Sequence, residues 1–327
     1  MKLRQSALAL AIAGIMAAPM AVQADSGFYG SVRIGVENVD SGGVTEMSVK
    51  NWASRMGFKG EADLGNGMTG YGKYEFSVNN SDGAAGASLG TRHQMVGLKG
   101  AFGNVFLGQT YHTFYNTVVG PLDNPWWGSG DAMVSYTGRT NGAISYAGDF
   151  GAVSVGATLY MRNTARGGVV DTAGEGETMD GTEIGVSFDA GPVRVGVAVQ
   201  DMQGNGAVDP ESVMGITASG ISFGGVTAGI GYQTQDVQNT SLTNTSIVLD
   251  VGFGPGYLHY EMMDNDETAG AANNPDPTSL TLGYTHSIGR QTTAWFEYQM
   301  VDSDDGLPSA TSADADTIRA ALKFDWK

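Results

Sequence analysis

The chain has 327 residues and no cysteine, and its 34 Asp and Glu outnumber its 17 Lys and Arg, for a net charge of −17. This charge argues against a nucleic-acid partner, and the lack of cysteine excludes a disulfide framework and a thiolate metal site. Charged residues make up 16%, below the roughly 25% that is usual in soluble proteins.

The first residues have the features of a bacterial secretory signal peptide. A positive start, Met1-Lys2-Leu3-Arg4, precedes the apolar run "ALALAIAGIMAA" at 7–18, and "VQA" at 22–24 supplies small residues for cleavage. The apolar run is too short to span a bilayer as a helix, which argues against the alternative of a retained N-terminal anchor. We therefore expect cleavage after Ala24, with 1–24 as signal peptide and 25–327 as one mature domain.

The mature chain is dominated by alternation with a period of two. Residues 28–37 place Val32, Ile34 and Val36 on one face and polar residues such as Arg33 and Glu37 on the other. The same pattern recurs at 71–78, 292–300 and 317–327. Alternation of this kind indicates strands that separate two environments. About sixteen such segments are present, each near the ten residues that a tilted membrane strand needs.

The connections between these segments alternate in length. Tight turns are expected at 64–67, 101–104, 149–152, 189–192, 222–225, 252–256 and 287–290. Long polar loops are expected at 39–51, 80–91, 112–137, 163–181, 203–211, 236–242, 265–277 and 302–315. Short turns on one side and long loops on the other favour a transmembrane antiparallel β-barrel over a soluble β-sandwich or solenoid. Aromatic residues near strand ends are expected to form its interfacial girdles: Phe28, Tyr111, Tyr160, Tyr232 and Trp326.

The segment "PLDNPWWGSGD" at 121–131 interrupts this rhythm. Its prolines, glycines and paired tryptophans suit neither a regular helix nor a strand. It lies within the third long connection, 112–137, and contains the acids Asp123 and Asp131.

Two stretches resemble the general diffusion porins of gram-negative bacteria. They are "ASRMGFKGEADLGNGMTGYGKYEFSVNNSDG" at 53–83 and "TRHQMVGLKGAFGNVFLGQTYHTFY" at 91–115. The resemblance implies a sixteen-stranded, homotrimeric outer-membrane barrel for passive diffusion of small hydrophilic solutes and ions. It also implies that the third long loop folds into the lumen, which makes 121–131 the constriction segment.

The resemblance further implies unlike charges on opposite sides of the constriction. Asp123 and Asp131 would form the acidic loop side, while Arg55, Arg92 and Arg139 match the basic wall. The polar faces of 28–37 and 71–78 add Arg33 and Lys73 to that wall. Small polar solutes pass such a neck because it stays hydrated, and the fixed charges set its selectivity.

Trp126 departs from the family pattern, because an acid is expected at its position. Loss of that carboxylate should weaken the preference for cations, and the indole should narrow the neck, pin the loop or stack on sugar rings. Two alternatives therefore stay open, a sugar-preferring channel and a non-conducting surface barrel or adhesin.

Enzyme chemistry has no support in the sequence. His93, His112, His259 and His286 are scattered without partners at metal-ligand spacing, and no nucleophile-elbow motif is present. We expect neither a cofactor nor a resident metal. Acid clusters at 264–267 and 302–305 suit either solvated loops or surface calcium, and divalent cations would also link the acidic chain to lipopolysaccharide.

Overall fold

The computed structural model describes residues 24–79, 88–127, 132–134, 136–161, 179–202, 211–236, 242–265, 276–303 and 314–326. The predicted signal peptide therefore lies almost wholly outside the described residues, as do Asp131 and half of the residues of the two acid clusters. None of the described helices is long and apolar enough to cross a membrane.

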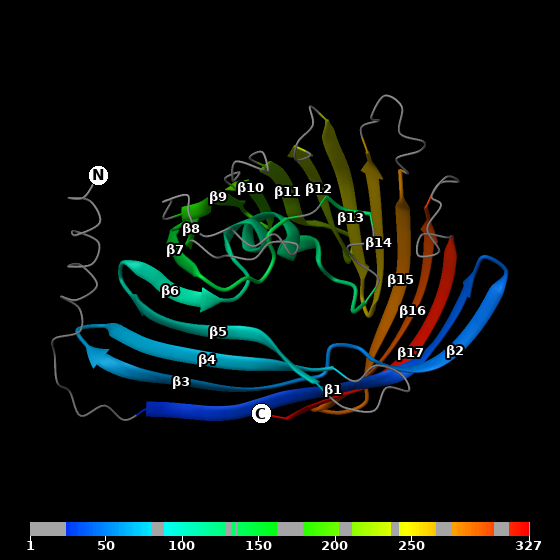
Figure 1. The fold of residues 1–327 in the computed structure, drawn as a ribbon, viewed down its shortest axis with the longest axis horizontal. Coiled ribbons are helices and arrows are strands. Elements are labelled where there is room, and N and C mark those ends of the chain that lie inside the picture. Colours follow the sequence, from blue (N-terminus) through cyan, green and yellow to red (C-terminus); the bar gives the residue numbers. More distant parts are fainter. Residues whose placement is uncertain are drawn as a thin grey trace, which may run out of the picture.

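The described chain forms one antiparallel sheet whose strands follow each other in chain order and curl into a ring (Figure 1). The strands are β1 (Ala24–Ser41), β2 (Val44–Asn51), β3 (Arg55–Gly65), β4 (Met68–Asn79), β5 (Ser88–Gly100), β6 (Gly103–Gln109), β7 (Ala143–Phe150), β8 (Val153–Met161), β9 (Met179–Ala190), β10 (Val193–Met202), β11 (Glu211–Phe223), β12 (Val226–Asp236), β13 (Thr243–Phe253), β14 (Gly256–Asp264), β15 (Thr278–Ser287), β16 (Thr292–Asp302) and β17 (Ala315–Trp326).

The sheet closes because β1 pairs with the last strand as well as with its successors. Gly30 lies opposite Trp326, and the pairing of β1 with β17 continues to Ser41. On its other edge, β1 pairs with β2 through Ile34–Ser41 and with β3 through Ala24–Ser31. β2 and β3 are thus two halves of one interrupted strand, so the seventeen assigned segments build a sixteen-stranded barrel. The predicted fold class is confirmed, and a two-sheet sandwich is excluded.

Trp52 causes the interruption between β2 and β3. Its ring is buried inside the barrel, 1% exposed, and a Cβ on Gly35 would lie 2.3 Å from it. Ala53 takes a positive φ of 56° directly after it, a conformation that a regular strand does not use. The ladder breaks here because the backbone turns to bury the indole.

The two faces of the sheet match the predicted alternation. Apolar side chains point outward and are exposed in the isolated chain, as for Ile34 (47%) and Leu322 (55%). Polar and charged neighbours point inward and are buried, as for Ser31, Glu75 and Glu297. A soluble protein shows the reverse pattern, whereas a barrel in lipid needs an apolar exterior and a polar interior.

All seven predicted tight turns are present, but the predicted loop at 39–51 is wrong. β1 and β2 continue their pairing to Ser41 and Val44, and the chain reverses through Gly42 and Gly43, both at positive φ. The polar composition of residues 40–46 suggested a loop, although a strand that extends beyond the bilayer has no need of apolar side chains.

The aromatic girdle prediction holds only in part. Phe28 and Tyr232 are each 44% exposed on the outer face, and Trp326 stacks near Phe28 with ring centroids 6.1 Å apart. Tyr160 instead points inward, fully buried, and donates its hydroxyl to Glu183 at 2.6 Å. Tyr111 stacks on Tyr115 of the segment between β6 and β7. Position near a strand end did not reveal which face these two tyrosines occupy.

Candidate pore constriction

The segment between β6 and β7 packs against the inner face of the barrel. It contains one π-helical turn, η1 (Tyr115–Val119), and one 3₁₀ turn, η2 (Gly120–Leu122), which lie within the ring of strands (Figure 1). Phe114, Val118 and Val119 are buried against Ala198 and Val213 of the wall. This small apolar core is one of the places where apolar residues lie inside the barrel, and the cluster around Trp52 is another.

Inward glycines let the segment approach the wall closely. A Cβ on Gly196 would lie 2.4 Å from the Thr117 carbonyl oxygen, one on Gly215 would lie 2.6 Å from Val118, and one on Gly229 would lie 2.4 Å from Leu122. Any larger residue at these strand positions would push η1 and η2 toward the centre of the barrel. Part of the glycine content of the strands is therefore explained by this packing.

Buried side chains of the wall accept hydrogen bonds from the irregular backbone of the segment. Glu183 accepts from the Phe114 N–H at 2.9 Å, Glu297 from Trp126 at 2.7 Å, and Glu261 from Ala132 at 3.0 Å. The amide oxygen of Gln200 accepts from the Thr137 N–H at 2.8 Å. Backbone donors outside regular structure need partners of this kind when they are buried. The carboxylates thus anchor the segment to β9, β14 and β16.

His259, which the sequence did not connect to any partner, contacts one of these anchoring carboxylates. His259 is 1% exposed and lies between two carboxylates, with Nδ1 3.0 Å from Asp250 and Nε2 3.0 Å from Glu261. Asp250 lies directly across the strand pair β13–β14, which sequence separation did not show, and Asn124 of the segment donates to it. Among the described residues no group of three or more His, Asp or Glu is arranged to hold a metal ion.

The predicted basic residues converge on the opposite wall. Arg33, Arg55 and Arg92 come from β1, β3 and β5, and Arg55 is close enough to Arg33, Arg92 and Arg139 to interact with their charges. Glu75 of β4 lies among them, 2.8 Å from Arg92 and 3.5 Å from Lys73. The side chain of Arg55 donates to the Ala53 carbonyl at 3.1 Å. All five predicted basic positions therefore belong to one cluster.

A ladder of tyrosines links this cluster to the predicted acidic side. The Arg139 guanidinium lies 4.8 Å from the centre of the Tyr111 ring, and Tyr111 stacks on Tyr115 with ring centroids 3.7 Å apart. Tyr115 donates its hydroxyl to Asp123 at 2.8 Å, and burial together with Asp123 raises the pKa of that phenol. Asp123 itself is exposed at the end of η2. The i, i+4 spacing of Tyr111 and Tyr115 was the available signal for this ladder.

Trp126 is held against the wall rather than projecting freely. Its ring lies 4.3 Å from that of Trp295, and the Arg33 guanidinium and the Lys323 ammonium lie 5.2 and 5.1 Å from its centre. Trp52 packs on Trp295 at 5.2 Å, and Trp127 lies 6.3 Å from Trp52. Four of the five tryptophans therefore form one cluster beside β1 and β16.

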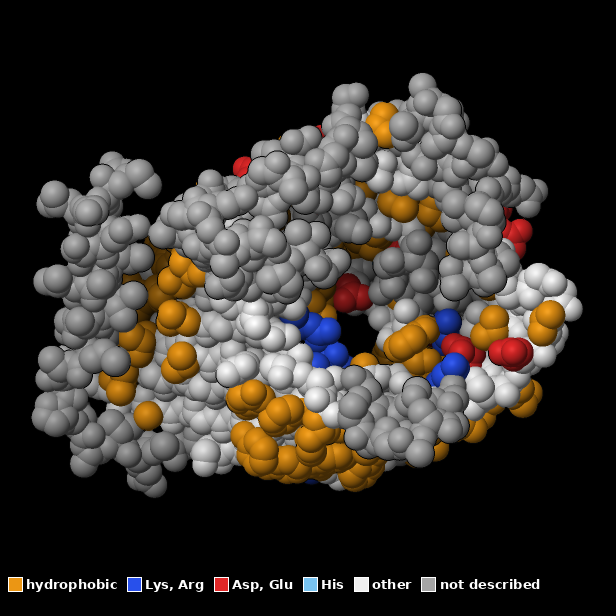
Figure 2. Space-filling view, in the orientation of Figure 1, with side chains coloured by type: hydrophobic (Ala, Val, Ile, Leu, Met, Phe, Trp, Pro, Cys, Tyr) orange, Lys and Arg blue, Asp and Glu red, His pale blue; other side chains and the backbone are white. Residues whose placement is uncertain are grey.

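Figure 2 shows an opening inside the ring of strands, in the same orientation as Figure 1. Lys and Arg side chains border its left edge, and an acidic side chain lies at its upper edge. Charges of both signs therefore lie at the margin of this opening. Of the predicted constriction residues, Asp131 lies outside the described residues.

A family model of Gram-negative porins matches residues 7–306. The chain belongs to the Gram-negative porin family. It is 33% identical over 142 residues to the major outer membrane protein P.IB of Neisseria meningitidis serogroup B / serotype 15 (strain H44/76), and 32% identical over 135 residues to that of Neisseria gonorrhoeae. These matches cover 40% and 38% of this chain and only 40% and 36% of the two relatives.

The barrel of this porin is also similar to solved structures. An anion-selective porin from Comamonas acidovorans superposes with a TM-score of 0.70 at 17% identity, over 93% of this chain and 100% of that one. Salmonella typhi OmpF, in complex with daunomycin, superposes with a TM-score of 0.69 at 18% identity, over 92% of this chain and 97% of that one. At these identities the likeness shows the fold alone. Family and apolar exterior together place the porin in the bacterial outer membrane.

Proposed function

We propose that this porin is a passive diffusion channel for small hydrophilic solutes and ions. The observation that carries the proposal is the opening inside a closed barrel, with both basic and acidic side chains at its margin. Such a path keeps solutes hydrated, and selectivity follows from its width and fixed charges. Its activity as a transporter, rather than an enzyme, agrees with the family.

The segment 112–137 is proposed as the constriction of this channel. Asp123 and Asp131 are its acidic residues, Trp126 its aromatic residue, and Arg33, Arg55, Arg92, Arg139 and Lys73 the facing basic wall. Support comes from the backbone hydrogen bonds to Glu183, Glu261 and Glu297, which hold the segment on the inner face of the barrel. Irregular backbone is stable at membrane depth when it lines a water-filled lumen.

We further propose that residues 1–24 are removed as a signal peptide and that the mature chain, 25–327, assembles as a homotrimer among lipid and lipopolysaccharide. OmpT of Vibrio cholerae, which has the same fold, has been solved in a trimer form. When the purified protein inserts into a planar bilayer, each inserted trimer should then add the conductance of three equal pores.

A planar lipid bilayer tests the proposal. The purified porin should give stable, ohmic current steps in potassium chloride, because a hydrated path remains open without a ligand. Insertion without any current would support the non-conducting barrel instead. Saturable block by oligosaccharide would support the sugar-preferring channel, although Trp126 already packs against Trp295, Arg33 and Lys323.

A further inference from the structure

One cluster of buried side chains holds the segment between β6 and β7 at two separate positions. The Asn124 side chain donates to Asp250 on β13, and the Ala132 backbone N–H donates to Glu261 on β14 at 3.0 Å. His259 lies between these two carboxylates, with Nδ1 3.0 Å from Asp250 and Nε2 3.0 Å from Glu261. The two anchors of the segment therefore meet at a single side chain of the wall.

The geometry of this cluster requires a proton on both nitrogens of the ring. A neutral imidazole has one N–H and one bare nitrogen, whereas an imidazolium donates from both nitrogens. With a neutral ring, one nitrogen lone pair would face a carboxylate oxygen at 3.0 Å. Asp250, His259 and Glu261 are 3%, 1% and 0% exposed, so water would not screen that repulsion. The positive ring also offsets the mutual repulsion of the two carboxylates.

The other groups around the ring do not supply a competing positive charge next to it. The titratable groups on the described elements packed around His259 are Asp123, Tyr136, Asp250, Tyr257, Glu261 and Glu297. Thr281 on β15, directly opposite His259, is neutral. Arg319 of β17 lies 3.9 Å from Glu297, which also accepts from the Tyr257 hydroxyl. The carboxylates nearest the ring thus rely on the imidazolium for their pairing.

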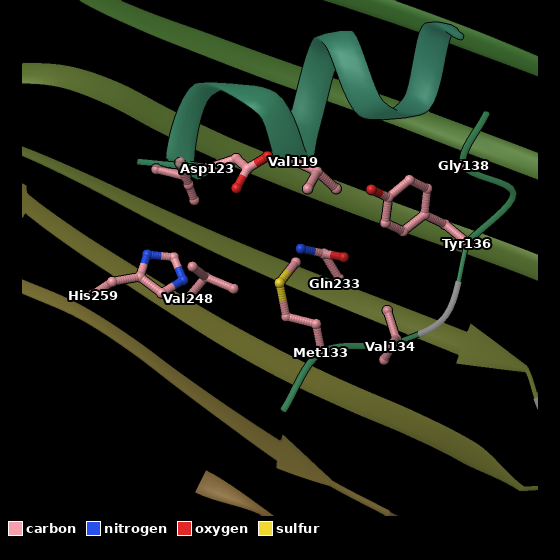
Figure 3. Close-up of a pocket in the computed structure, with 10 residues that line it drawn as sticks. Val119, Asp123, Met133, Val134, Tyr136, Gly138, Gln233, Val248 and His259 are labelled. Carbon is pink, nitrogen blue, oxygen red and sulfur yellow. The ribbon is translucent and has the colours of Figure 1, made fainter. Parts of the chain in front are cut away.

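A cavity beside the cluster gives the segment room to shift. Its volume is about 350 Å³, and Figure 3 shows His259 of the wall together with Asp123 and Met133 of the segment at its margin. Well-packed regions resist displacement because any movement creates clashes or voids. Next to this cavity, loosening of the two anchors allows the segment to move while the strands of the wall stay paired.

We propose that the His259 imidazolium is a positioning residue of the pore constriction, and that loss of its proton loosens the segment on both sides of Trp126. At high pH the ring gives its proton to hydroxide, which forms water and leaves a neutral imidazole. One carboxylate then loses its donor, so Asn124 and Ala132 lose well-oriented acceptors. The proposal rests on the channel function only for its electrical readout, since anchoring does not require a conducting pore.

Single-channel recordings over a series of pH values test the role of the proton. The unmodified porin should give quiet current steps at acidic and neutral pH, and frequent transitions to smaller sublevels at strongly alkaline pH. Asp250→Asn should stay quiet at alkaline pH, because its amide N–H donates to a neutral ring while its carbonyl oxygen still accepts from Asn124. His286→Gln changes an exposed histidine of β15 and should keep the pH response of the unmodified porin.

Amide hydrogen exchange of the full-length porin in detergent tests the anchoring without any current. In His259→Gln at neutral pH, the Ala132 N–H should exchange about tenfold faster, because Glu261 loses the charged donor that orients it. The Phe114 N–H, which Glu183 accepts at 2.9 Å, is the internal reference and should be unchanged. Recordings of His259→Gln should show the sublevels already at neutral pH, without a further change at alkaline pH.

Each measurement has a result that overturns the proposal. The role of the proton is contradicted if the unmodified porin is equally quiet at every pH, or if Asp250→Asn responds to pH as the unmodified porin does. The anchoring role is contradicted if Ala132 exchange is unchanged in His259→Gln. If no current is found at all, the channel proposal fails, and exchange at Ala132 in the unmodified porin and Asp250→Asn at alkaline pH decides this inference. The same comparison decides it if His259→Gln does not fold.

Discussion

The two sides of the lumen use inward charges in opposite ways. On β1, β3 and β5, Arg33, Arg55 and Arg92 lie close together, so Arg55 has like charges among its neighbours. On β9, β14 and β16, the carboxylates are buried and accept the backbone N–H groups of the segment that crosses the lumen. The same alternation produces both sets, so an inward position does not define a role. A charge that is hydrogen-bonded to the backbone of the segment stabilises the fold, whereas we expect a charge among like charges to influence passing ions.

The largest expected effect comes from breaking an anchor. Glu297→Ala removes the carboxylate that accepts from the Trp126 and Trp127 N–H groups and from the Tyr257 hydroxyl, and should cost about 2–3 kcal/mol, because these buried donors lose a charged acceptor. Thermal unfolding followed by heat-modifiable gel migration measures this loss. Glu297→Gln is the control, because its amide oxygen still accepts, and it should lose less than half as much. Equal stability of both variants would contradict the anchoring role.

Removing a charge from the basic wall should change the ion selectivity of the channel more than the stability of the fold. Arg55→Gln removes one charge from the proposed basic wall, and a unit charge 4 Å away in water is worth about 1 kcal/mol, or roughly fivefold in the local ratio of ions. Reversal potentials in a potassium chloride gradient should shift toward cations. Arg194→Gln is the control, because Arg194 lies beside a tight turn and is paired with Asp189 at 2.9 Å. Equal shifts in the two variants would show that Arg55 does not face the path of the ions.

A smaller shift in reversal potential is expected when an acid is placed at position 126. Trp126→Glu places a carboxylate near Arg33 and Lys323, which lie 5.2 and 5.1 Å from the present ring. Cation preference should rise, but less than in Arg55→Gln, because these two cations partly neutralise the new charge. Trp126→Gln controls for loss of the indole. If the reversal potentials of both variants match that of the unmodified porin, residue 126 lies away from the neck.

The sequence predicted the barrel well because each strand carries its own alternation. Ile34 and Arg33 reveal their faces without knowledge of any other strand, and Gly65 and Gly67 reveal a turn by their local chemistry. The contacts across the lumen were not predictable in this way. Glu297 and Trp126 are 171 residues apart, and Asp250 meets His259 only through the register of β13 and β14. Trp52 was also missed, since the break that buries it depends on Gly35 of the facing strand.

The central claim is that the segment 112–137 narrows a water-filled barrel. Single-channel conductance of a variant lacking residues 121–131 tests it most directly, with the unmodified porin recorded in the same bilayers. The account predicts larger current steps for the variant, since the acidic residues and both tryptophans of the neck are removed. An unchanged step size would place the segment outside the path of the ions and contradict the account.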